Sequence, residues 1–143
     1  MANNEFPVEE RFGELVTGER WGIVPFALYK YQKALGLKIH EVWFLCWLFM
    51  HKWEEKDTFP SLNALHRYTG VSRQYIQVLA HGLEEKGYIN IKQRLLENGA
   101  NGSNFYDINP FLSTLEELIE EDRYSEFCKK EAHATPDIQG VQL

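Results

Sequence analysis

The stretch of residues 61–108 constrains the fold more than any other part of this 143-residue chain. It contains two runs with helical apolar spacing, and each run begins after a serine, Ser61 or Ser72. Each run also ends at a glycine, Gly70 or Gly87. Serine is a favoured N-cap residue, and glycine readily adopts the left-handed conformation that commonly ends a helix. The pattern therefore predicts a short capped helix, a tight turn and a second capped helix.

Apolar side chains recur at three- and four-residue steps in both runs, as on the buried face of an amphipathic helix. The expected core residues are Leu62, Leu65 and Tyr68 in the first helix, and Ile76, Leu79, Ala80 and Leu83 in the second, which spans about residues 72–86. Residues 88–94 and 103–108 instead alternate apolar and polar residues, and residues 97–102 between them contain two Asn-Gly pairs. Alternation and Asn-Gly turns together predict a β-hairpin.

Two helices joined by a tight turn and followed by a hairpin form the winged helix-turn-helix arrangement. We therefore expect a mainly α fold with a small β-hairpin (α+β), extended by an extra C-terminal helix. In this arrangement the first helix braces the second, whose exposed face can enter a DNA major groove about 12 Å wide. The hairpin tip can then reach phosphates or the neighbouring groove.

The N-terminal part of the chain supplies flanking elements. Residues 1–20 look polar and irregular, and residues 21–25 look extended, because the residue before a proline is pushed towards the β region. Pro25 suits the first turn of a helix, and Gly36 suits its end. The apolar surface of this helix is expected to come from Phe26, Leu28, Tyr29, Tyr31, Ala34 and Leu35.

Residues 39–53 carry the strongest helical pattern in the chain. Ile39, Val42, Trp43, Cys46, Trp47, Met50 and Trp53 fall at three- and four-residue steps, and Phe44, Leu45, Leu48 and Phe49 fill the other sides. A helix that is apolar nearly all round is expected to be buried in the middle of a small domain, with Trp43 and Trp47 in the core. A charged loop is expected over residues 54–57.

The C-terminal part restarts a helix at Asn109 and Pro110. Its apolar residues are Phe111, Leu115, Leu118 and Ile119, and its acidic residues are Glu116, Glu117, Glu120, Glu121 and Asp122. The resulting domain assignment is a polar N-terminal segment (1–20), a winged-helix DNA-binding domain (21–112), an acidic amphipathic helix (113–131) and a flexible tail (132–143).

The second helix of the predicted motif presents a polar outward face when Ile76, Leu79 and Leu83 point inward. That face consists of Arg73, Gln74, Gln77, Val78 and His81, and no acidic residue precedes Glu84 on the helix. Arginine favours guanine and glutamine favours adenine, while histidine can donate to a base or a phosphate. The helix N-terminus at Ser72 also presents free backbone N–H groups to phosphate. The candidate DNA-binding residues of this helix are therefore Ser72, Arg73, Gln74, Gln77 and His81.

The hairpin adds Lys92, Arg94 and Asn101 to the candidate DNA-binding residues, with Asn98 and Asn104 as further backbone contacts. An exposed polar helix face or turn is often simply solvated, and that interpretation stays open for both regions. For Asn63 and Arg67 on the first helix, solvation is the better interpretation than a phosphate contact.

The distribution of charge matters more here than its total. The chain carries 21 acidic and 15 basic residues, for a net charge of -6. Residues 1–20 hold five acidic and two basic groups, and residues 109–143 hold eight acidic and three basic groups. The two central stretches, 21–61 and 62–108, each hold five basic and four acidic groups. The acidic total argues against tight non-specific DNA binding, so the pattern predicts modest, salt-sensitive affinity.

Several other classes of protein find no support in the sequence. The two cysteines have no metal spacing, the N-terminus lacks the features of a signal peptide, and the longest apolar run is far shorter than the ~20 residues that span a bilayer. No nucleotide-binding loop or nucleophile elbow is present. His40 and His51 lie about 16 Å apart along a helix, too far to share one metal. We expect a cytoplasmic, non-enzymatic protein without cofactor, metal or membrane segment.

Residues 59–91 contain a Pro-Ser, Gly-Val-Ser and Lys-Gly-Tyr-Ile pattern, followed by Asn-Phe-Tyr-Asp-Ile-Asn-Pro at 104–110. This pattern resembles the helix-turn-helix domain of phage, plasmid and integrative-element replication initiators. Residues 22–41 are similar to the N-terminal winged-helix domain of DnaD-type primosome proteins. The resemblance covers about residues 21–112 and implies double-stranded DNA binding in replication initiation, and it is compatible with self-association. Unlike the DnaD type, this sequence contains no long C-terminal domain, so we expect either a fragment of a longer protein or a small stand-alone DNA-binding protein.

Two alternatives to a role in replication initiation remain open at the level of sequence. The same DNA contacts would serve a transcriptional regulator. The acidic C-terminal helix and its apolar stripe would suit a protein–protein interaction module on the winged-helix scaffold. A homodimer through the N-terminal segment or the C-terminal helix, and contacts with other replication proteins, are compatible with each of these functions.

Overall fold

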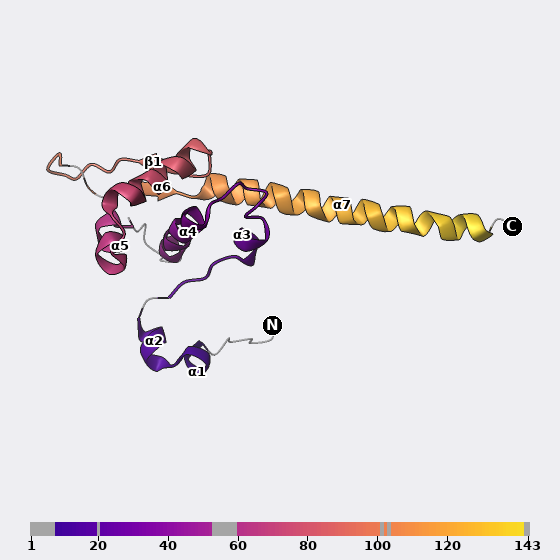
Figure 1. Cartoon of the computed structure of the whole chain (residues 1–143), viewed down its shortest axis with the longest axis horizontal. Helices are drawn as coiled ribbons and strands as arrows, with labels where there is room; N and C mark the ends of the chain where they lie inside the picture. The colour runs from indigo at the N-terminus through magenta and orange to yellow at the C-terminus, as the bar shows by residue number, and fades with distance from the viewer. Residues whose placement is uncertain (1–7, 20, 53–59, 101, 103, 142–143) are drawn as a thin grey trace.

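The computed structural model of the chain describes residues 8–19, 21–52, 60–100, 102 and 104–141, with side chains as far as residue 133. In chain order the elements are α1 (Val8–Phe12), α2 (Glu14–Gly18), α3 (Phe26–Lys30), α4 (Ile39–Lys52), α5 (Leu62–Thr69), α6 (Arg73–Glu85), β1 (Asn90–Lys92), β2 (Phe105–Asp107) and α7 (Asn109–Val141). Figure 1 shows α3 to α6 and the hairpin gathered in one body, from which α7 projects, while α1 and α2 stand apart. The mainly α fold with one small two-stranded sheet is confirmed.

The two central helices begin and end at the residues that the sequence predicts. The Ser61 hydroxyl accepts a hydrogen bond from the Ala64 amide at 3.1 Å, and the Ser72 hydroxyl accepts one from the Tyr75 amide at 3.2 Å. Gly70 ends α5 with a φ of 75°, in the left-handed region that favours glycine. These side-chain caps satisfy backbone donors that the first turn leaves unpaired.

The predicted core faces of α5 and α6 are correct with one exception. Leu62 and Leu65 of α5 are buried, as are all four predicted residues of α6: Ile76, Leu79, Ala80 and Leu83. Tyr68 is not a core residue, since it is 72% exposed and the Arg67 guanidinium lies 5.2 Å from its ring. It lies in the last turn of α5, beyond the region that α6 covers.

The predicted hairpin forms, with strands shorter than expected. β1 and β2 pair antiparallel, with Ile91 opposite Tyr106 and Lys92 opposite Phe105. β2 leads directly into α7, where the Asp107 carboxylate accepts a hydrogen bond from the Asn109 amide at 3.0 Å. The chain therefore turns from the wing into the C-terminal helix without a linker.

α7 is longer than the sequence predicts. It runs through Val141, so residues 132–141 are helical where we expected a flexible tail. Residues 129–134 are Lys, Lys, Glu, Ala, His and Ala, and most of these have high helix propensity. Thr135, Pro136 and Gly140 have low helix propensity, and residues 132–141 also lack an apolar stripe, so the sequence pattern does not indicate this last part of the helix.

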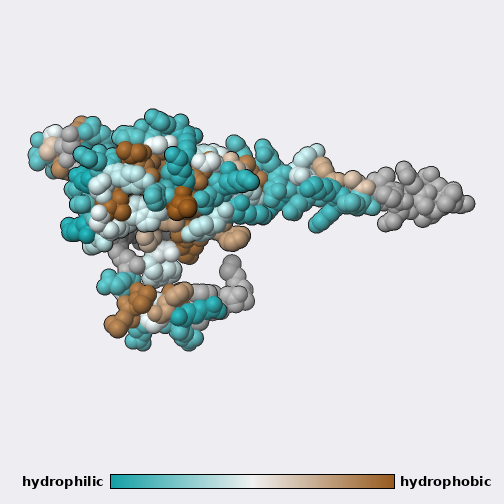
Figure 2. Space-filling model, in the orientation of Figure 1, coloured by the Kyte–Doolittle hydropathy of each residue, from teal (hydrophilic) through white to brown (hydrophobic). Residues whose placement is uncertain are grey.

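The expectation of an irregular N-terminal segment is also wrong for the described residues 8–18. They form α1 and α2, each with glutamate in its first turn, where negative charge favours a helix. Phe12, Leu15 and Val16 are exposed, and Figure 2 shows apolar surface on this part of the molecule. Both helices are too short to show a periodic pattern in the sequence.

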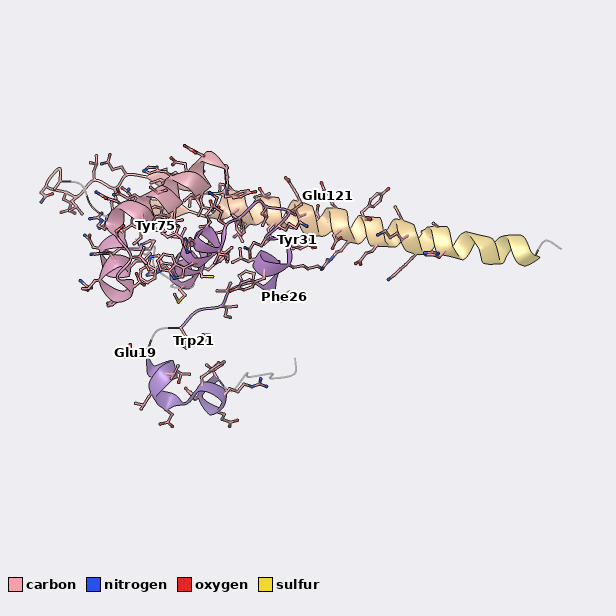
Figure 3. All side chains as sticks on the ribbon, in the orientation of Figure 1. Glu19, Trp21, Phe26, Tyr31, Tyr75 and Glu121 are labelled. Carbon is pink, nitrogen blue, oxygen red and sulfur yellow. The ribbon has the colours of Figure 1, made fainter. Side chains whose placement is uncertain are left out.

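Residues 21–25 are extended, and Pro25 stands at the N-terminal boundary of α3, as predicted. The expected apolar surface of this helix is only partly buried: Leu28 and Leu35 are in the core, but Phe26 is 78% exposed and Tyr29 is also exposed. The Tyr31 hydroxyl instead donates to the Asp122 carboxylate of α7 at 3.0 Å, and Figure 3 shows Tyr31 beside that helix.

α4 forms the centre of the body, but it is buried on one side and not all round. Its buried residues are Glu41, Val42, Phe44, Leu45, Leu48 and Phe49. Ile39 is 77% exposed and Met50 is exposed, while Trp43, Cys46 and Trp47 are half-buried against the core. Trp53 and the expected charged loop at 54–57 lie outside the described residues.

Aromatic contacts join the hairpin and α7 to α4. The rings of Phe44 and Tyr106 meet edge to face with centroids 6.1 Å apart, and those of Phe49 and Phe111 do the same at 6.1 Å. Tyr88 packs against Phe111 at 5.6 Å. Edge-to-face pairs add to the stabilisation that burial provides. The core therefore ties the wing, the start of α7 and α4 into one unit.

Candidate nucleic-acid interface

α6 is the helix that the sequence predicts to read DNA, and its outward face is open. Arg73, Gln74, Gln77, Val78 and His81 are all exposed. The opposite face is buried against α4 and α5 through Ile76 and Leu83, both fully inaccessible. A rigidly held helix with one polar face free is the arrangement from which side chains can reach base edges.

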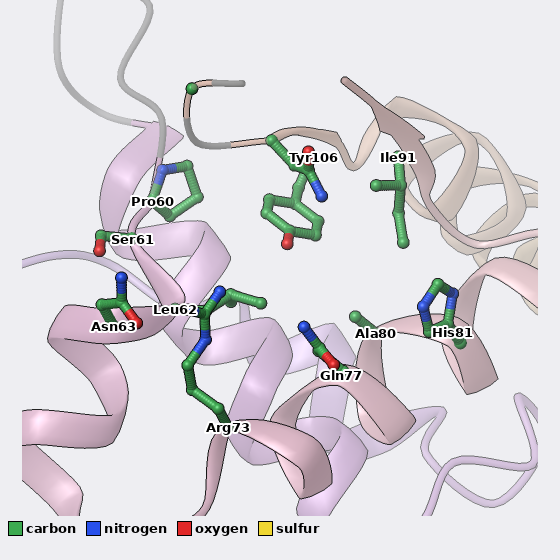
Figure 4. A pocket seen from close by; sticks show the side chains of 12 residues that line it. Pro60, Ser61, Leu62, Asn63, Arg73, Gln77, Ala80, His81, Ile91 and Tyr106 are labelled. Carbon is green, nitrogen blue, oxygen red and sulfur yellow. The ribbon is translucent and has the colours of Figure 1, made fainter. Parts of the chain in front are cut away.

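Three of these residues share a hollow between α6 and the wing. Arg73, Gln77 and His81 lie on one strip of α6, because residues four apart on a helix are neighbours. The hollow has a volume of about 180 Å³ and is completed by Asn63 of α5 and by Asn104 and Tyr106 of the wing. In Figure 4 the Gln77 amide and the Tyr106 hydroxyl point into it from opposite walls.

Tyr106 is the least expected member of this group. It is buried under the wing, and that burial raises the pKa of its phenol. A side-chain hydrogen bond with Asn104 and the positive charge of Arg73 act in the opposite direction on the same pKa. The Tyr106 hydroxyl therefore stays neutral at physiological pH and can donate a hydrogen bond within the hollow. Its strand position predicts only that one face of the strand is buried, so the sequence carried no signal for this role.

Donor groups outnumber acceptors around the hollow. Its lining includes one guanidinium, one imidazole, three side-chain amides and one phenol, and none of the described residues that line it is acidic. Leu62, Ala80 and Ile91 add apolar wall. This composition suits a ligand with negative charge and hydrogen-bonding edges. It would disfavour a metal cation of the kind that carboxylates bind.

Contacts at both ends hold α6 in place. At its C-terminal end the Lys86 ammonium lies 2.6 Å from the Glu41 carboxylate of α4 and donates to the Gly36 carbonyl at 2.8 Å. Near its N-terminal end the Tyr75 hydroxyl is hydrogen-bonded to the His40 imidazole of α4. These contacts lie beside the outward face and leave it open.

The Glu84 carboxylate accepts a hydrogen bond from the Ile91 amide at 3.2 Å, which ties the wing to α6. The same residue lies 3.8 Å from the His81 imidazole, as an ion pair when the histidine is protonated. As predicted, no acidic residue lies on the outward face of α6 from Arg73 to His81. Glu84 is the first acidic residue of the helix.

The remaining candidates on the wing do not join the hollow. Lys92 is exposed on β1, and Arg94 borders a separate depression with Leu96 and Asn98 near the wing tip. Asn101 lies outside the described residues. Ser72 uses its hydroxyl oxygen to cap α6, and Gln74 is exposed but does not line the hollow.

Other sites considered in the sequence have structural roles. His40 bonds to Tyr75, and His51 packs on the Trp47 ring with centroids 4.4 Å apart. Within the described residues, no group of three or more His, Cys, Asp or Glu side chains is placed to hold a metal ion. No helix in the described part of the chain has the length and apolar character needed to cross a membrane.

Comparison with known proteins agrees with this architecture. No curated protein sequence matches the chain. The N-terminal domain of DnaD protein from Geobacillus kaustophilus HTA426 matches in structure with a TM-score of 0.55 and 22% identity, covering 82% of this chain and 94% of that one. At this identity the match shows a shared fold.

The family comparison extends over most of the body and the first half of α7. The model of the DnaD N-terminal domain matches residues 24–126, which is well over half of the chain and includes the whole helix-turn-helix and wing. The similarity to DnaD-type primosome proteins inferred from residues 22–41 is thereby confirmed. The protein belongs to the DnaD N-terminal domain family.

Proposed function

We propose that this protein binds double-stranded DNA through α6 and the wing, and that it acts in replication initiation as a cytoplasmic, primosome-like factor of a bacterium or a mobile element. The observation that carries the proposal is the outward face of α6, where the donor side chains of Arg73, Gln74, Gln77 and His81 are exposed and no acidic residue of the helix precedes Glu84. The family supports an association with DNA replication.

In this proposal α6 lies in the major groove. Arg73 donates to guanine, Gln74 and Gln77 contact adenine edges, and His81 contacts a base or a phosphate. The backbone at Ser72 anchors the helix N-terminus to a phosphate. Lys92, Arg94 and Asn101 hold the wing against the sugar-phosphate backbone, which fixes register without adding sequence information. No step of this function needs a catalytic group or a cofactor.

The charge balance sets the expected strength of binding. Few phosphate contacts are available on a chain of net charge -6 whose acid is concentrated at its two ends. Each phosphate contact contributes about 0.9 to the slope of log affinity against log salt. We therefore expect moderate, salt-sensitive affinity, with a salt slope set by the small number of phosphate contacts and with specificity carried mainly by base contacts.

Self-association is part of the proposal because two surfaces outside the body are open. Phe12, Leu15 and Val16 are exposed on α1 and α2, and Tyr124 and Phe127 are exposed on the projecting part of α7. A homodimer through either surface would place two copies of α6 on a two-fold site. Transcriptional regulation would use the same DNA contacts and is the second candidate role.

The test is selection of bound duplexes from a random pool at two salt concentrations, followed by titration of the enriched sequence. We expect Arg73→Ala to weaken specific binding by ~1–3 kcal/mol and to relax the preference at one base position. Arg123→Ala, an exposed arginine on α7, is the matched control and should bind as the wild type does. Failure to retain any duplex at low salt would refute DNA binding, and an enriched palindrome would support the dimer.

A further inference from the structure

The outward face of α6 divides into two strips with different surroundings. Arg73, Gln77 and His81 border the hollow beneath the wing, whereas Gln74 and Val78 do not line it. Gln74 and Val78 are exposed beside the hollow. The first strip instead faces a concave space closed on its far side by Tyr106 and Ile91 (Figure 4).

The size of the hollow limits what it can hold. Its volume of about 180 Å³ is below the range of about 300–1,000 Å³ typical of pockets for drug-sized ligands. A double helix cannot enter such a space, because even its major groove is about 12 Å wide. One planar ring system is the largest group that fits, with any attached charged group left at the mouth.

The lining identifies the chemistry of that ring. Asn63, Gln77 and Asn104 each offer an amide donor and an amide acceptor, which is the pattern that pairs with the hydrogen-bonding edge of a nucleobase. The Tyr106 hydroxyl adds a further polar group at the back. Leu62, Ala80 and Ile91 supply apolar atoms against which the flat faces of a base can pack.

Arg73 completes the match. Its guanidinium is the one formal cation among the described residues that line the hollow, and none of these described residues is acidic. An arginine at the mouth can bind a phosphate through paired N–H groups while the base lies inside. The faces of a base would then contact the apolar wall, its hydrogen-bonding edge would contact the amides, and its phosphate would contact Arg73.

We propose that the hollow between α6 and the wing binds one unpaired nucleotide of DNA, with its base between Gln77, Asn104 and Tyr106 and its phosphate against Arg73. This inference rests on the proposed contact between α6 and DNA, and it names the form of DNA that the site prefers. Extruding a paired base costs a few kcal/mol, and least where the base is already mismatched or single-stranded. The domain should therefore favour DNA that is already locally open.

The experiment compares four probes by fluorescence anisotropy on the whole chain: a paired duplex, the same duplex with one bulged nucleotide, the same duplex with an abasic bulge, and a free mononucleotide as competitor. Contacts to one base correspond to about tenfold or more in affinity. We expect the bulged duplex to bind at least about tenfold more tightly than the paired duplex, with the abasic bulge losing most of that gain.

Variants then locate the effect. Gln77→Leu and Asn104→Ala should reduce the preference for the bulge to about one- to threefold. Gln93→Leu and Asn90→Ala remove exposed amides of the wing region that do not line the hollow, and these should keep the full preference. Thermal unfolding of each variant establishes that it is folded.

The outcomes separate this inference from the proposed function. Equal binding of paired and bulged duplexes would overturn the inference and leave duplex binding by α6 intact. Equal binding of the base-containing and abasic bulges would also overturn it, because flexibility of the DNA would then explain the gain. Displacement by an equimolar free mononucleotide would assign the hollow to a small ligand and contradict a DNA site. Binding of no DNA probe would end both proposals.

Discussion

α4 and α6 pack against each other and have similar lengths, 14 and 13 residues, yet they differ in how strongly their sequences define a solvent face. On α6, Ile76, Leu79, Ala80 and Leu83 form one apolar face, and the other face is polar apart from the exposed Val78; the structure buries the apolar face as predicted. On α4, apolar residues surround the helix, and the structure leaves Ile39 and Met50 exposed. Polar residues therefore carry the orientation signal, and a uniformly apolar helix lacks it.

The comparison also bears on what each helix does. The exposed side of α6 is polar, and it is the side that forms the proposed DNA interface. The less buried side of α4 is covered in part by the extended residues 21–25, where a Cβ added at Gly22 would lie 2.8 Å from the Met50 side chain. Only a glycine lets this segment approach α4 so closely. Both sides of α4 therefore have a packing role: one lies in the core, and the other is partly covered by residues 21–25.

The largest effect expected from this comparison concerns the two faces of α4. Phe44→Ala should destabilise the protein by ~3–5 kcal/mol, because Phe44 is fully buried and contacts Tyr106. Ile39→Ala should change stability by no more than about 0.5 kcal/mol, since the side chain is largely solvent-exposed. Urea unfolding of both variants provides the measurement. Similar losses in the two variants would mean that the buried face of α4 is assigned wrongly.

The next effect concerns the ion pair that joins α4 to α6. Glu41 and Lys86 have side chains 5% and 32% exposed, so the carboxylate is buried and the ammonium partly solvated. Lys86→Ala leaves the Glu41 charge without its partner and should cost ~2–3 kcal/mol, below the range for a fully buried pair because water still reaches the site. The double variant Glu41→Gln, Lys86→Met should recover part of that loss. An unchanged unfolding midpoint for Lys86→Ala would contradict the link.

A smaller effect is expected at the N-terminus of α6. Ser72→Ala removes the acceptor for the Tyr75 amide and should reduce stability by ~1 kcal/mol. Ser72→Asp keeps an acceptor in the same place and should remain close to the wild type. Thermal unfolding compares the three proteins. A loss in the aspartate variant as large as in the alanine variant would argue against capping by this side chain.

The smallest effect concerns alkaline pH at the wall of the hollow. Burial raises the pKa of Tyr106, so folding favours its neutral form. The unfolded chain releases this proton near pH 10.0, and the folded protein does so only at higher pH. The contribution of the neutral Tyr106 side chain to the free energy of unfolding is therefore complete below about pH 10. It is lost as the pH rises through the pKa of Tyr106 in the folded protein. Tyr106→Phe, which cannot ionise, should lose less stability between about pH 8 and about pH 11 than the wild type does. If the free energy of unfolding fell with pH equally in the two proteins, the raised pKa of Tyr106 would be contradicted.

The sequence predicted the helix-turn-helix and the wing well because each boundary has a local chemical cause. Ser61 and Ser72 cap helices, Gly70 takes a left-handed turn, and the alternating strands flank Asn-Gly turns. It also predicted that Arg73, Gln77 and His81 would share the outward face. These features depend on residues a few positions apart, which is the range over which a sequence pattern is informative.

The features that the sequence did not predict depend on distant contacts. The hollow needs Tyr106 and Asn104 to lie opposite Gln77, and only the packing of the wing on α6 brings them there. The helical extent of α7 beyond residue 131 has no periodic apolar signal, and its Pro136 and Gly140 have low helix propensity, so the sequence does not indicate it. The burial of Phe44 in preference to Ile39 follows from where α6 and the hairpin dock on α4.

The central claim is that DNA meets the protein at α6 and the wing, and NMR mapping of backbone amides during titration with the selected duplex tests it most directly. We expect the largest chemical-shift changes at Arg73, Gln74, Gln77, His81 and Lys92, with residues 116–131 of α7 little affected. Changes confined to α7 or to α1 and α2, with the amides of α6 unmoved at saturating DNA, would contradict the account.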